Sequence, residues 1–211
     1  MRVLFMQGIE SLFYILILII SVVIHEVAHG YAALRFGDKT ALYAGRLTLN
    51  PLKHLDWFGS VILPGLLVLS GTGMVLGWAK PVPYNPNNLS PRRKGVLWVA
   101  MAGIIANIIT AILFALILRV MVAVGYYSDP IFFILQGVVL INIVLAVFNL
   151  VPIPPLDGSK VLFELLPYRY HHIKVLLEKY SIFLFLAFIF FGWQYVSPVV
   201  FGLFSVMTGT L

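Results

Sequence analysis

Long apolar runs, separated by short polar segments, follow one another along the chain. They extend from about Gly8 to Phe36, from Trp57 to Trp78, from Val96 to Arg119 and from Ile131 to Leu150. A helix that crosses a membrane needs about 20 predominantly apolar residues, because it rises ~1.5 Å per residue through a hydrocarbon core ~30 Å thick. The first, third and fourth runs are therefore predicted to be membrane-spanning helices.

The last two of these spans are joined by a short turn, Tyr126 to Pro130, which predicts an antiparallel hairpin. A proline-rich break follows, and then a short amphipathic piece from Ser159 to Leu166. The final apolar region runs from about Val175 to Leu211 and is divided by Gly192 and Pro198. We expect it to hold one or two membrane segments.

The weaker run from Trp57 to Trp78 is best interpreted through the charges around it. The Tyr126 to Pro130 turn has no Lys or Arg. Seven basic residues lie between the first and third spans: Lys39, Arg46, Lys53, Lys80, Arg92, Arg93 and Lys94. The positive-inside rule places residues 37–94 in the cytoplasm. A full crossing would put Lys53 and Arg93 on opposite faces, so we favour a re-entrant hairpin that breaks near Gly71 to Gly73.

Composition agrees with a membrane environment. Of the 211 residues, 61% are hydrophobic and only 10% are charged, and the mean hydropathy is +1.01, as in polytopic membrane proteins. We predict an all-α bundle of about four to six transmembrane helices, with a re-entrant or β-like membrane-associated segment. The net charge of +6 does not indicate nucleic-acid binding, because the basic residues lie between apolar spans. No removable signal peptide is expected, since no cleavage site precedes the first run.

The first span contains the candidate metal-binding and catalytic residues. His25 and His29 are four residues apart, so they lie on one face of a helix and can bind the same Zn²⁺. Glu26 is then placed to take a proton from the attacking water. Ionisable groups are costly inside a membrane and mark functional sites by default. With no cysteine in the chain, thiolate ligands and disulfides are excluded. The metal would lie about 22 Å along a helix that enters near Glu10, close to the cytoplasmic face.

Asp157 is the leading candidate for a third zinc ligand. It follows the cytoplasmic end of the fourth span, where three prolines prevent the helix from continuing and let the chain fold back. The alternative is that Asp157 only caps the next helix. The residue three positions on is Lys160, however, so no capping box supports that alternative.

Two motifs in order resemble the site-2 protease family of intramembrane zinc metalloproteases. They are His25-Glu-x-x-His29 and Asn149-Leu-Val-Pro-x-x-Pro-Leu-Asp157-Gly, and the likeness covers about Val22 to Leu166. Gly45 to Pro51 and Gly77 to Pro83 resemble the small prokaryotic members, which lack PDZ and CBS domains. The resemblance implies that His25, His29 and Asp157 bind one zinc ion per chain and that Glu26 activates water.

Ala102 to Asn107 is similar to the family's Ala-Gly-Pro-x-x-Asn pattern, with Ile104 in place of the proline. The resemblance implies that Asn107 approaches the site as an amide donor to substrate or oxyanion; the alternative is a hydrogen bond that packs helices. It also implies that Gly77 to Asn88 is a β-like loop that pairs with substrate, where the alternative is a plain cytoplasmic loop. We interpret His54 as a surface or interfacial histidine.

These observations lead to one hypothesis with two alternatives. Residues 1–211 are expected to form a single transmembrane protease domain, with a catalytic core at about 8–166 and C-terminal membrane segments at about 175–211. The hypothesis is a zinc-dependent endopeptidase of a prokaryotic cell membrane that cuts membrane proteins or signal-peptide remnants and has no nucleic-acid partner. The alternatives are a metal-ion permease, which would need polar groups along a whole route, and an inactive homologue. The oligomeric state stays open.

Overall fold

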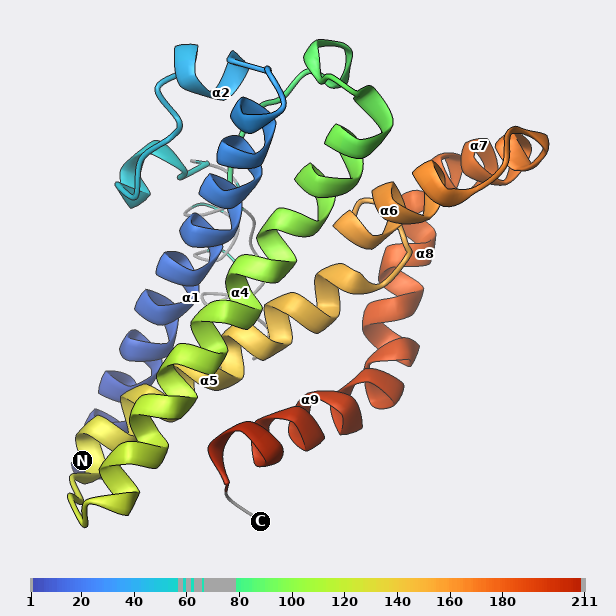
Figure 1. Ribbon diagram of the computed structural model, residues 1–211. Helices are drawn as coiled ribbons and strands as arrows, with labels where there is room; N and C mark the ends of the chain where they lie inside the picture. The colour runs from blue at the N-terminus through green and yellow to red at the C-terminus, as the bar shows by residue number, and fades with distance from the viewer. Residues whose placement is uncertain (1, 57–58, 60–61, 63–65, 67–78, 210–211) are drawn as a thin grey trace.

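The structure is a computed structural model that describes residues 2–56, 59, 62, 66 and 79–209 (Figure 1). All regular secondary structure among these residues is helical, which confirms the predicted all-α class. The predicted re-entrant or spanning segment, Trp57 to Trp78, lies almost wholly outside the described residues.

Four helical stretches within the described part of the chain are long and apolar enough to cross a membrane. They are α1 (Arg2–Arg35, with its apolar part from Leu12), α4 (Arg92–Ala123), α5 (Asp129–Leu150) and the C-terminal stretch Ser181–Thr208. Each of the first three contains one of the predicted spans, apart from Phe36 at the end of the first. The shorter helical elements are α2 (Thr40–Tyr43), α6 (Asp157–Leu165), α7 (His171–Lys179) and the 3-10 turns Pro51–Lys53, Pro86–Asn88 and Tyr168–Tyr170.

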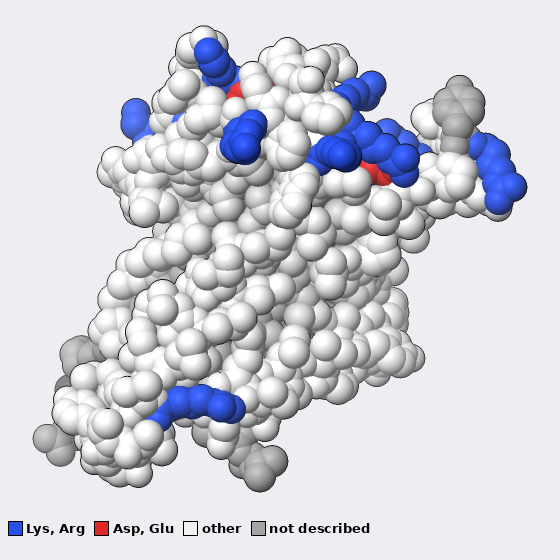
Figure 2. Space-filling view, in the orientation of Figure 1, with Lys and Arg blue, Asp and Glu red and all other residues white. Residues whose placement is uncertain are grey.

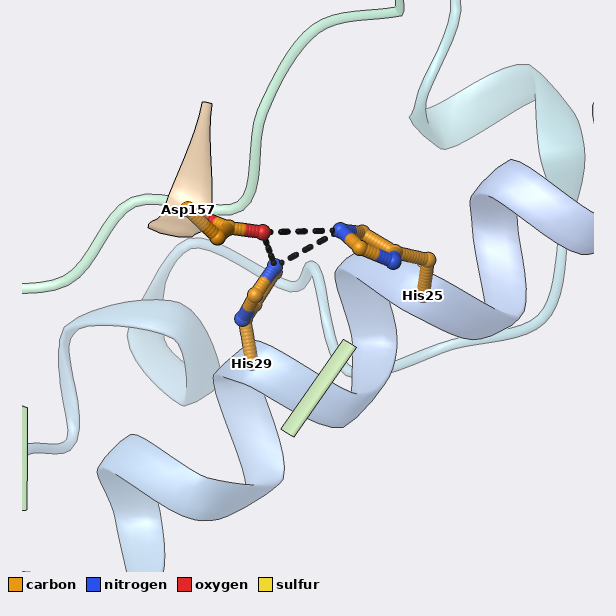
Figure 3. Close-up of side chains that lie close together, drawn as sticks. All are labelled: His25, His29 and Asp157. Atoms are coloured by element: carbon orange, nitrogen blue, oxygen red, sulfur yellow. Dashed lines mark hydrogen bonds and ion pairs between the residues drawn. The ribbon is translucent and has the colours of Figure 1, made fainter. Parts of the chain in front are cut away.

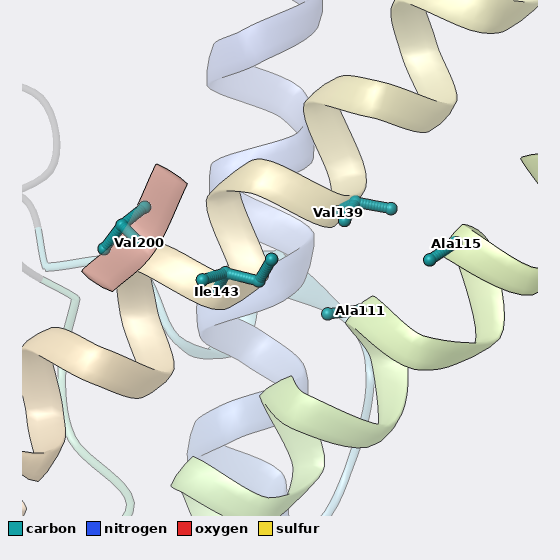
Figure 4. Close-up of a cluster of buried hydrophobic side chains, with 5 residues drawn as sticks. All are labelled: Ala111, Ala115, Val139, Ile143 and Val200. Atoms are coloured by element: carbon teal, nitrogen blue, oxygen red, sulfur yellow. The ribbon is translucent and has the colours of Figure 1, made fainter. Parts of the chain in front are cut away.

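The helices run alternately up and down (Figure 1). The predicted hairpin is present, because α4 and α5 pack against each other and are joined by the short connection at residues 124–128. α1 packs along α4, and α9 (Trp193–Thr208) packs on α5. Ala111 and Ala115 of α4 face Val139 and Ile143 of α5 in the bundle core (Figure 4). Small side chains at such positions let membrane helices approach closely.

The C-terminal apolar region forms one candidate span. α8 (Ser181–Ala187) continues through a π-helical turn, Phe188–Gly192, into α9, and the ribbon bends there (Figure 1). A Cβ on Gly192 would overlap the ring of Phe188, so a larger residue at that position would displace the ring. Of the one or two segments that the sequence allowed, the structure shows one, and Pro198 lies inside α9.

Residues 79–85 form no regular secondary structure and lie against the polar end of α1. Arg46 donates weak hydrogen bonds, at 3.4 Å, to the carbonyls of Lys80 and Pro81. Asp38, just past α1, accepts hydrogen bonds from the backbone N–H of Asn85 at 2.6 Å and from the Asn88 side chain at 2.9 Å. These contacts hold the 79–88 segment across the end of α1, next to His25 and Glu26.

Charged side chains gather at one end of the molecule. Figure 2 shows Lys and Arg clustered at the end where α4 begins, above a broad uncharged surface, with one isolated basic side chain near the opposite end. Arg119, near the end of α4, donates hydrogen bonds to the carbonyls of Val206 and Met207. This distribution matches the predicted grouping of the basic residues between the first and third spans.

Candidate metal centre

His25 and His29 lie on the face of α1 that packs toward α4, where each is buried, with 6% and 7% of its surface exposed. Their spacing of four residues brings the rings together across one helical turn. The two Nε2 atoms are 3.0 Å apart (Figure 3). The helix alone therefore supplies two converging nitrogen ligands.

Asp157 reaches this pair from the first turn of α6. α5 ends at Leu150, and the chain turns through the proline-rich residues 151–156 before α6 begins. Gly158 makes the turn possible, because a Cβ there would overlap the carbonyl of Leu150. Asp157 is 5% exposed, and its Oδ2 lies 3.0 Å from Nε2 of both histidines. The structure thus brings together the three residues that the sequence assigned to the metal.

The partner of each Nδ1 atom shows which ring nitrogen of the two histidines carries the proton. His29 Nδ1 is 2.6 Å from the carbonyl oxygen of Val99, which only accepts, so Nδ1 of His29 carries a proton. His25 Nδ1 is 2.6 Å from Oδ1 of Asn107 and donates to it. In the neutral rings both Nε2 atoms therefore present lone pairs to each other and to the Asp157 carboxylate.

This donor set fits zinc. Three acceptor atoms in a buried triangle with sides of 3.0 Å repel one another unless a proton or a cation lies among them. Two ligands of a tetrahedral Zn²⁺, each at ~2.0–2.1 Å from the ion, are about 3.3 Å apart, close to the sides observed. Two imidazoles and one carboxylate form a catalytic zinc set, which leaves the fourth position for water or substrate.

Lys160 binds the other oxygen of Asp157. Its Nζ donates to Oδ1 at 2.8 Å, so Oδ2 is left for the histidines. Burial by itself lowers the pKa of Lys160, but the negative charge and hydrogen bond of Asp157 outweigh it and raise that pKa. Burial likewise acts to raise the pKa of Asp157, but the adjacent charge of Lys160 lowers it and favours the ionised form. The Asp157 carboxylate is accordingly ionised.

Glu26 lines the same cavity as the three ligands, which has a volume of about 480 Å³. Pro81, Val82, Pro83 and Tyr84 form part of its wall. The backbone N–H of Val82 donates to Oε2 of Glu26 at 2.7 Å, which positions the carboxylate beside the ligands. The prolines on either side have no N–H to donate, so Val82 supplies the hydrogen bond.

Asn107 lies behind the site. It is fully buried, its Oδ1 accepts from His25, and its Nδ2 donates to Oδ1 of Asn142 at 2.8 Å and, more weakly, to the backbone oxygen of Ser21 at 3.4 Å. It is not among the residues that line the cavity. These bonds match the alternative of a hydrogen bond between helices, and a role on substrate stays a prediction without a contact that supports it.

Several residues around the ligands were not found from the sequence. Gly103 lies against the His25 ring, where a Cβ would be 2.5 Å from Nε2. Asn142 and Ser21 complete the hydrogen bonds behind Asn107. The available signal was an asparagine within each of two apolar helices, because a polar side chain in a membrane helix needs a partner.

The prediction for His54 was wrong. This histidine is 1% exposed, its Nε2 lies 2.8 Å from the carbonyl of Thr48, and its own carbonyl accepts from the backbone N–H of Lys80. The loop therefore folds around His54 and joins it to the 79–88 segment. It does not belong to the metal-ligand group found in the described residues.

The family model described as "Peptidase family M50" matches residues 13–132 and 126–192. The chain belongs to peptidase family M50. The resemblance to site-2 proteases is thereby confirmed. The matched residues include His25, Glu26, His29 and Asp157, and they extend from the first candidate span into the beginning of the fourth.

Relatives of this M50 chain carry names that agree with the donor set. "Putative zinc metalloprotease YwhC" of Bacillus subtilis is 40% identical over 161 residues, which cover 74% of this chain and 69% of YwhC. "Putative zinc metalloprotease Rip2" is 33% identical in Mycolicibacterium smegmatis, over 66% of this chain and 52% of that protein. The protein of the same name in Mycobacterium tuberculosis is 31% identical, over 68% of this chain and 53% of that protein. The chain therefore spans only about half of the Rip2 proteins. No solved structure matches the chain.

Proposed function

We propose that this M50 protein is a zinc-dependent endopeptidase that cuts membrane-protein substrates within or near their transmembrane segments. One observation carries the proposal: two histidines and an aspartate converge, and Glu26 shares their cavity inside a bundle of apolar helices. His25, His29 and Asp157 would hold one Zn²⁺ per chain. The names of the relatives support the metal and the reaction class.

The roles of the side chains follow from their positions. Bound zinc supplies a Lewis acid that polarises a carbonyl and makes water more acidic. Glu26 takes the proton from the attacking water and returns it to the leaving amine. Its hydrogen bond from Val82 keeps the carboxylate directed toward the cavity before substrate arrives. Lys160 keeps Asp157 ionised and oriented.

The surroundings support a site near the cytoplasmic face of a prokaryotic cell membrane. His25 lies ten residues before the end of α1, about 15 Å along the helix axis, and α1 ends where the basic residues gather. The positive-inside rule assigns that end to the cytoplasm. Substrates of this class are single-span proteins or the remnants of signal peptides, whose peptide bonds must leave a helix before water can attack them.

The test is cleavage of a panel of tagged single-span substrates by the purified protein in liposomes, with wild type and Glu26→Gln compared. Glutamine keeps the size of Glu26 and can still accept the Val82 hydrogen bond, but it cannot take a proton from water. We expect wild type to cut at least one substrate, a zinc chelator to stop the cutting, and Glu26→Gln to lose at least ~10³-fold in rate, within the range that general-base and metal-assisted steps contribute.

Zinc content is measured on the same samples. Glu26→Gln is expected to retain the metal, because Glu26 is not among the three ligands, so its loss of cleavage would report the chemical step. Cleavage by Glu26→Gln at the wild-type rate would contradict the proposed mechanism. If wild type binds zinc, cuts nothing in the panel and passes zinc across the liposome membrane, the protein is a permease and the proposal fails.

A further inference from the structure

Three membrane helices meet behind His25 through buried polar side chains. Asn107 of α4 and Asn142 of α5 are fully buried, and Ser21 of α1 is 2% exposed. Nδ2 of Asn142 donates to the carbonyl of Val138 at 2.8 Å and to the hydroxyl of Ser21 at 2.9 Å. Oδ1 of Asn142 accepts from Nδ2 of Asn107. The chain of bonds ends at His25, whose Nδ1 donates a hydrogen bond to Oδ1 of Asn107.

The direction of this chain is fixed at its far end. The carbonyl of Val138 can only accept, so the side of Asn142 that faces it must be the amide nitrogen. Oδ1 of Asn142 then faces Asn107, which must turn its own nitrogen toward Asn142 and its oxygen toward His25. An oxygen at that place accepts a proton, and the proton of a neutral His25 ring is therefore on Nδ1.

We propose that Asn142, acting through Asn107, sets the tautomer of His25 and so keeps its Nε2 free to bind the metal. Asn142 touches neither the cavity nor the three ligand atoms, so it is a positioning residue. The inference rests on the proposed zinc site, because a free Nε2 serves a function only if a cation binds there. His29 needs no such relay, since a backbone carbonyl at Val99 fixes its tautomer directly.

Removing the relay has a specific consequence. In Asn142→Leu, the side chain keeps a similar volume but offers Asn107 no oxygen. Asn107 Nδ2 then keeps only its weaker contact of 3.4 Å with the Ser21 carbonyl, so the amide rotates more readily to present its nitrogen to His25, which favours a proton on Nε2. Partners that fix the orientation of a metal-binding histidine typically contribute 10–100-fold in metal affinity. We expect zinc affinity to fall by about that factor in Asn142→Leu.

The experiment has two readouts on purified protein in detergent. The first is zinc affinity, measured by competition with a chelator of known affinity. The second is the ¹⁵N chemical shift of the histidine ring nitrogens in metal-free protein at about pH 8, where an ordinary histidine is neutral; His25 is assigned by comparison with His25→Ala. Wild type is expected to carry a proton on Nδ1 of His25, whether or not a second proton lies on Nε2 among the three facing atoms, and Asn142→Leu to lose part of that Nδ1 protonation.

Asn142→Asp separates the relay from a role in helix packing. Burial in an apolar helix favours protonated aspartate, whose hydroxyl can donate to Val138 while its other oxygen accepts from Asn107, so the tautomer and most of the zinc affinity should return. If packing alone mattered, Asp would harm the site at least as much as Leu. Thr110→Val is the matched control, because it removes a hydrogen bond of Thr110 to its own helix on α4, outside the relay; it should leave both readouts unchanged.

The outcomes distinguish this inference from the proposed function. The Nδ1 proton is measured on metal-free wild type, with His25→Ala used only for the assignment, and a His25 whose Nδ1 carries no proton would overturn the relay. Zinc affinity in Asn142→Leu equal to that of wild type would also overturn it. A wild-type protein that binds no zinc would instead contradict the proposed function, whatever its tautomer.

Discussion

At the scale of single residues, His25 depends on the absence of a side chain opposite it. Gly103 of α4 is buried beside the imidazole ring, and a Cβ there would lie 2.5 Å from Nε2 and Cε1 and 2.6 Å from Nδ1. Real Cβ atoms essentially never approach that closely, so the ring would have to move. The ring cannot move without losing either Asn107 or the other two ligand atoms.

Gly103→Ala is therefore expected to lower zinc affinity by at least about 10-fold, as in other disturbances of histidine orientation, and to slow cleavage in proportion. Chelator competition measures the affinity. Gly202→Ala is the matched control, since Gly202 lies in α9 with open space around its Cβ position, and it should bind zinc like wild type. Equal affinities in Gly103→Ala and wild type would show that the ring has room that the structure does not give it.

Local patterns predicted the ligands but not what surrounds them. The spacing of His25 and His29 determines their common face on any helix, and the prolines before Asp157 end α5 and let the chain fold back. Asn142 lies in a strongly apolar helix, where neighbours in sequence do not indicate which distant side chain it contacts. His54 was placed wrongly for the same reason, because its burial depends on Thr48 and on the remote Lys80.

At the scale of elements, Asp38 joins the end of α1 to the segment that crosses the site. Burial acts to raise the pKa of Asp38, but hydrogen bonds from Thr40, Asn88 and the backbone of Asn85 outweigh it and lower the pKa below its usual value. The carboxylate thus binds the folded chain in its charged form. It fixes residues 85–88 and, through them, the position of Val82 over Glu26.

Asp38→Asn should reduce the free energy of unfolding by ~1–3 kcal/mol near neutral pH, because an amide nitrogen would face some of these donors. A carboxyl with a depressed pKa stabilises the fold above its unfolded pKa of about 3.9, and this contribution is lost as the pH falls through the lower folded value. The difference between wild type and Asp38→Asn should be constant above about pH 5 and shrink in stronger acid. Thermal unfolding in detergent at a series of pH values measures it, and a difference that grows toward acid would contradict this account.

The elements themselves were largely predictable. The three strong apolar runs became α1, α4 and α5, because a membrane requires every backbone hydrogen bond to be made within the helix and this leaves few alternatives. The ends differ by a few residues, as when α4 begins at Arg92 rather than Val96. Whether the last region crosses once or twice could not be predicted, since Gly192 and Pro198 are each compatible with a break or with a continuous bent helix.

At the scale of the whole molecule, the basic end fixes how the bundle should sit in a membrane. Lys39 and Tyr127 are exposed near opposite ends of the helices, the first just past α1 and the second in the α4–α5 turn. The four candidate spans of the described residues alternate in direction and place these two ends on opposite faces. Only the charge bias indicates which face is cytoplasmic, and the sequence already carried that information.

Single cysteines introduced at these positions test the orientation, because the chain has no cysteine of its own. With a membrane-impermeant maleimide, Tyr127→Cys should react in intact cells, and Lys39→Cys only after the membrane is permeabilised. The cysteine-free wild type gives the background. Reaction of Lys39→Cys in intact cells would place the basic end outside and contradict the proposed cytoplasmic site.

The central claim is that His25, His29 and Asp157 hold one zinc ion, and zinc content together with zinc X-ray absorption of the purified protein tests it most directly. We expect one zinc per chain, with two imidazoles and oxygen ligands at ~2.0–2.1 Å, retained in Glu26→Gln and lost in His29→Ala and Asp157→Ala. Wild type without stoichiometric zinc, or an unchanged zinc spectrum in the two alanine variants, would contradict the account.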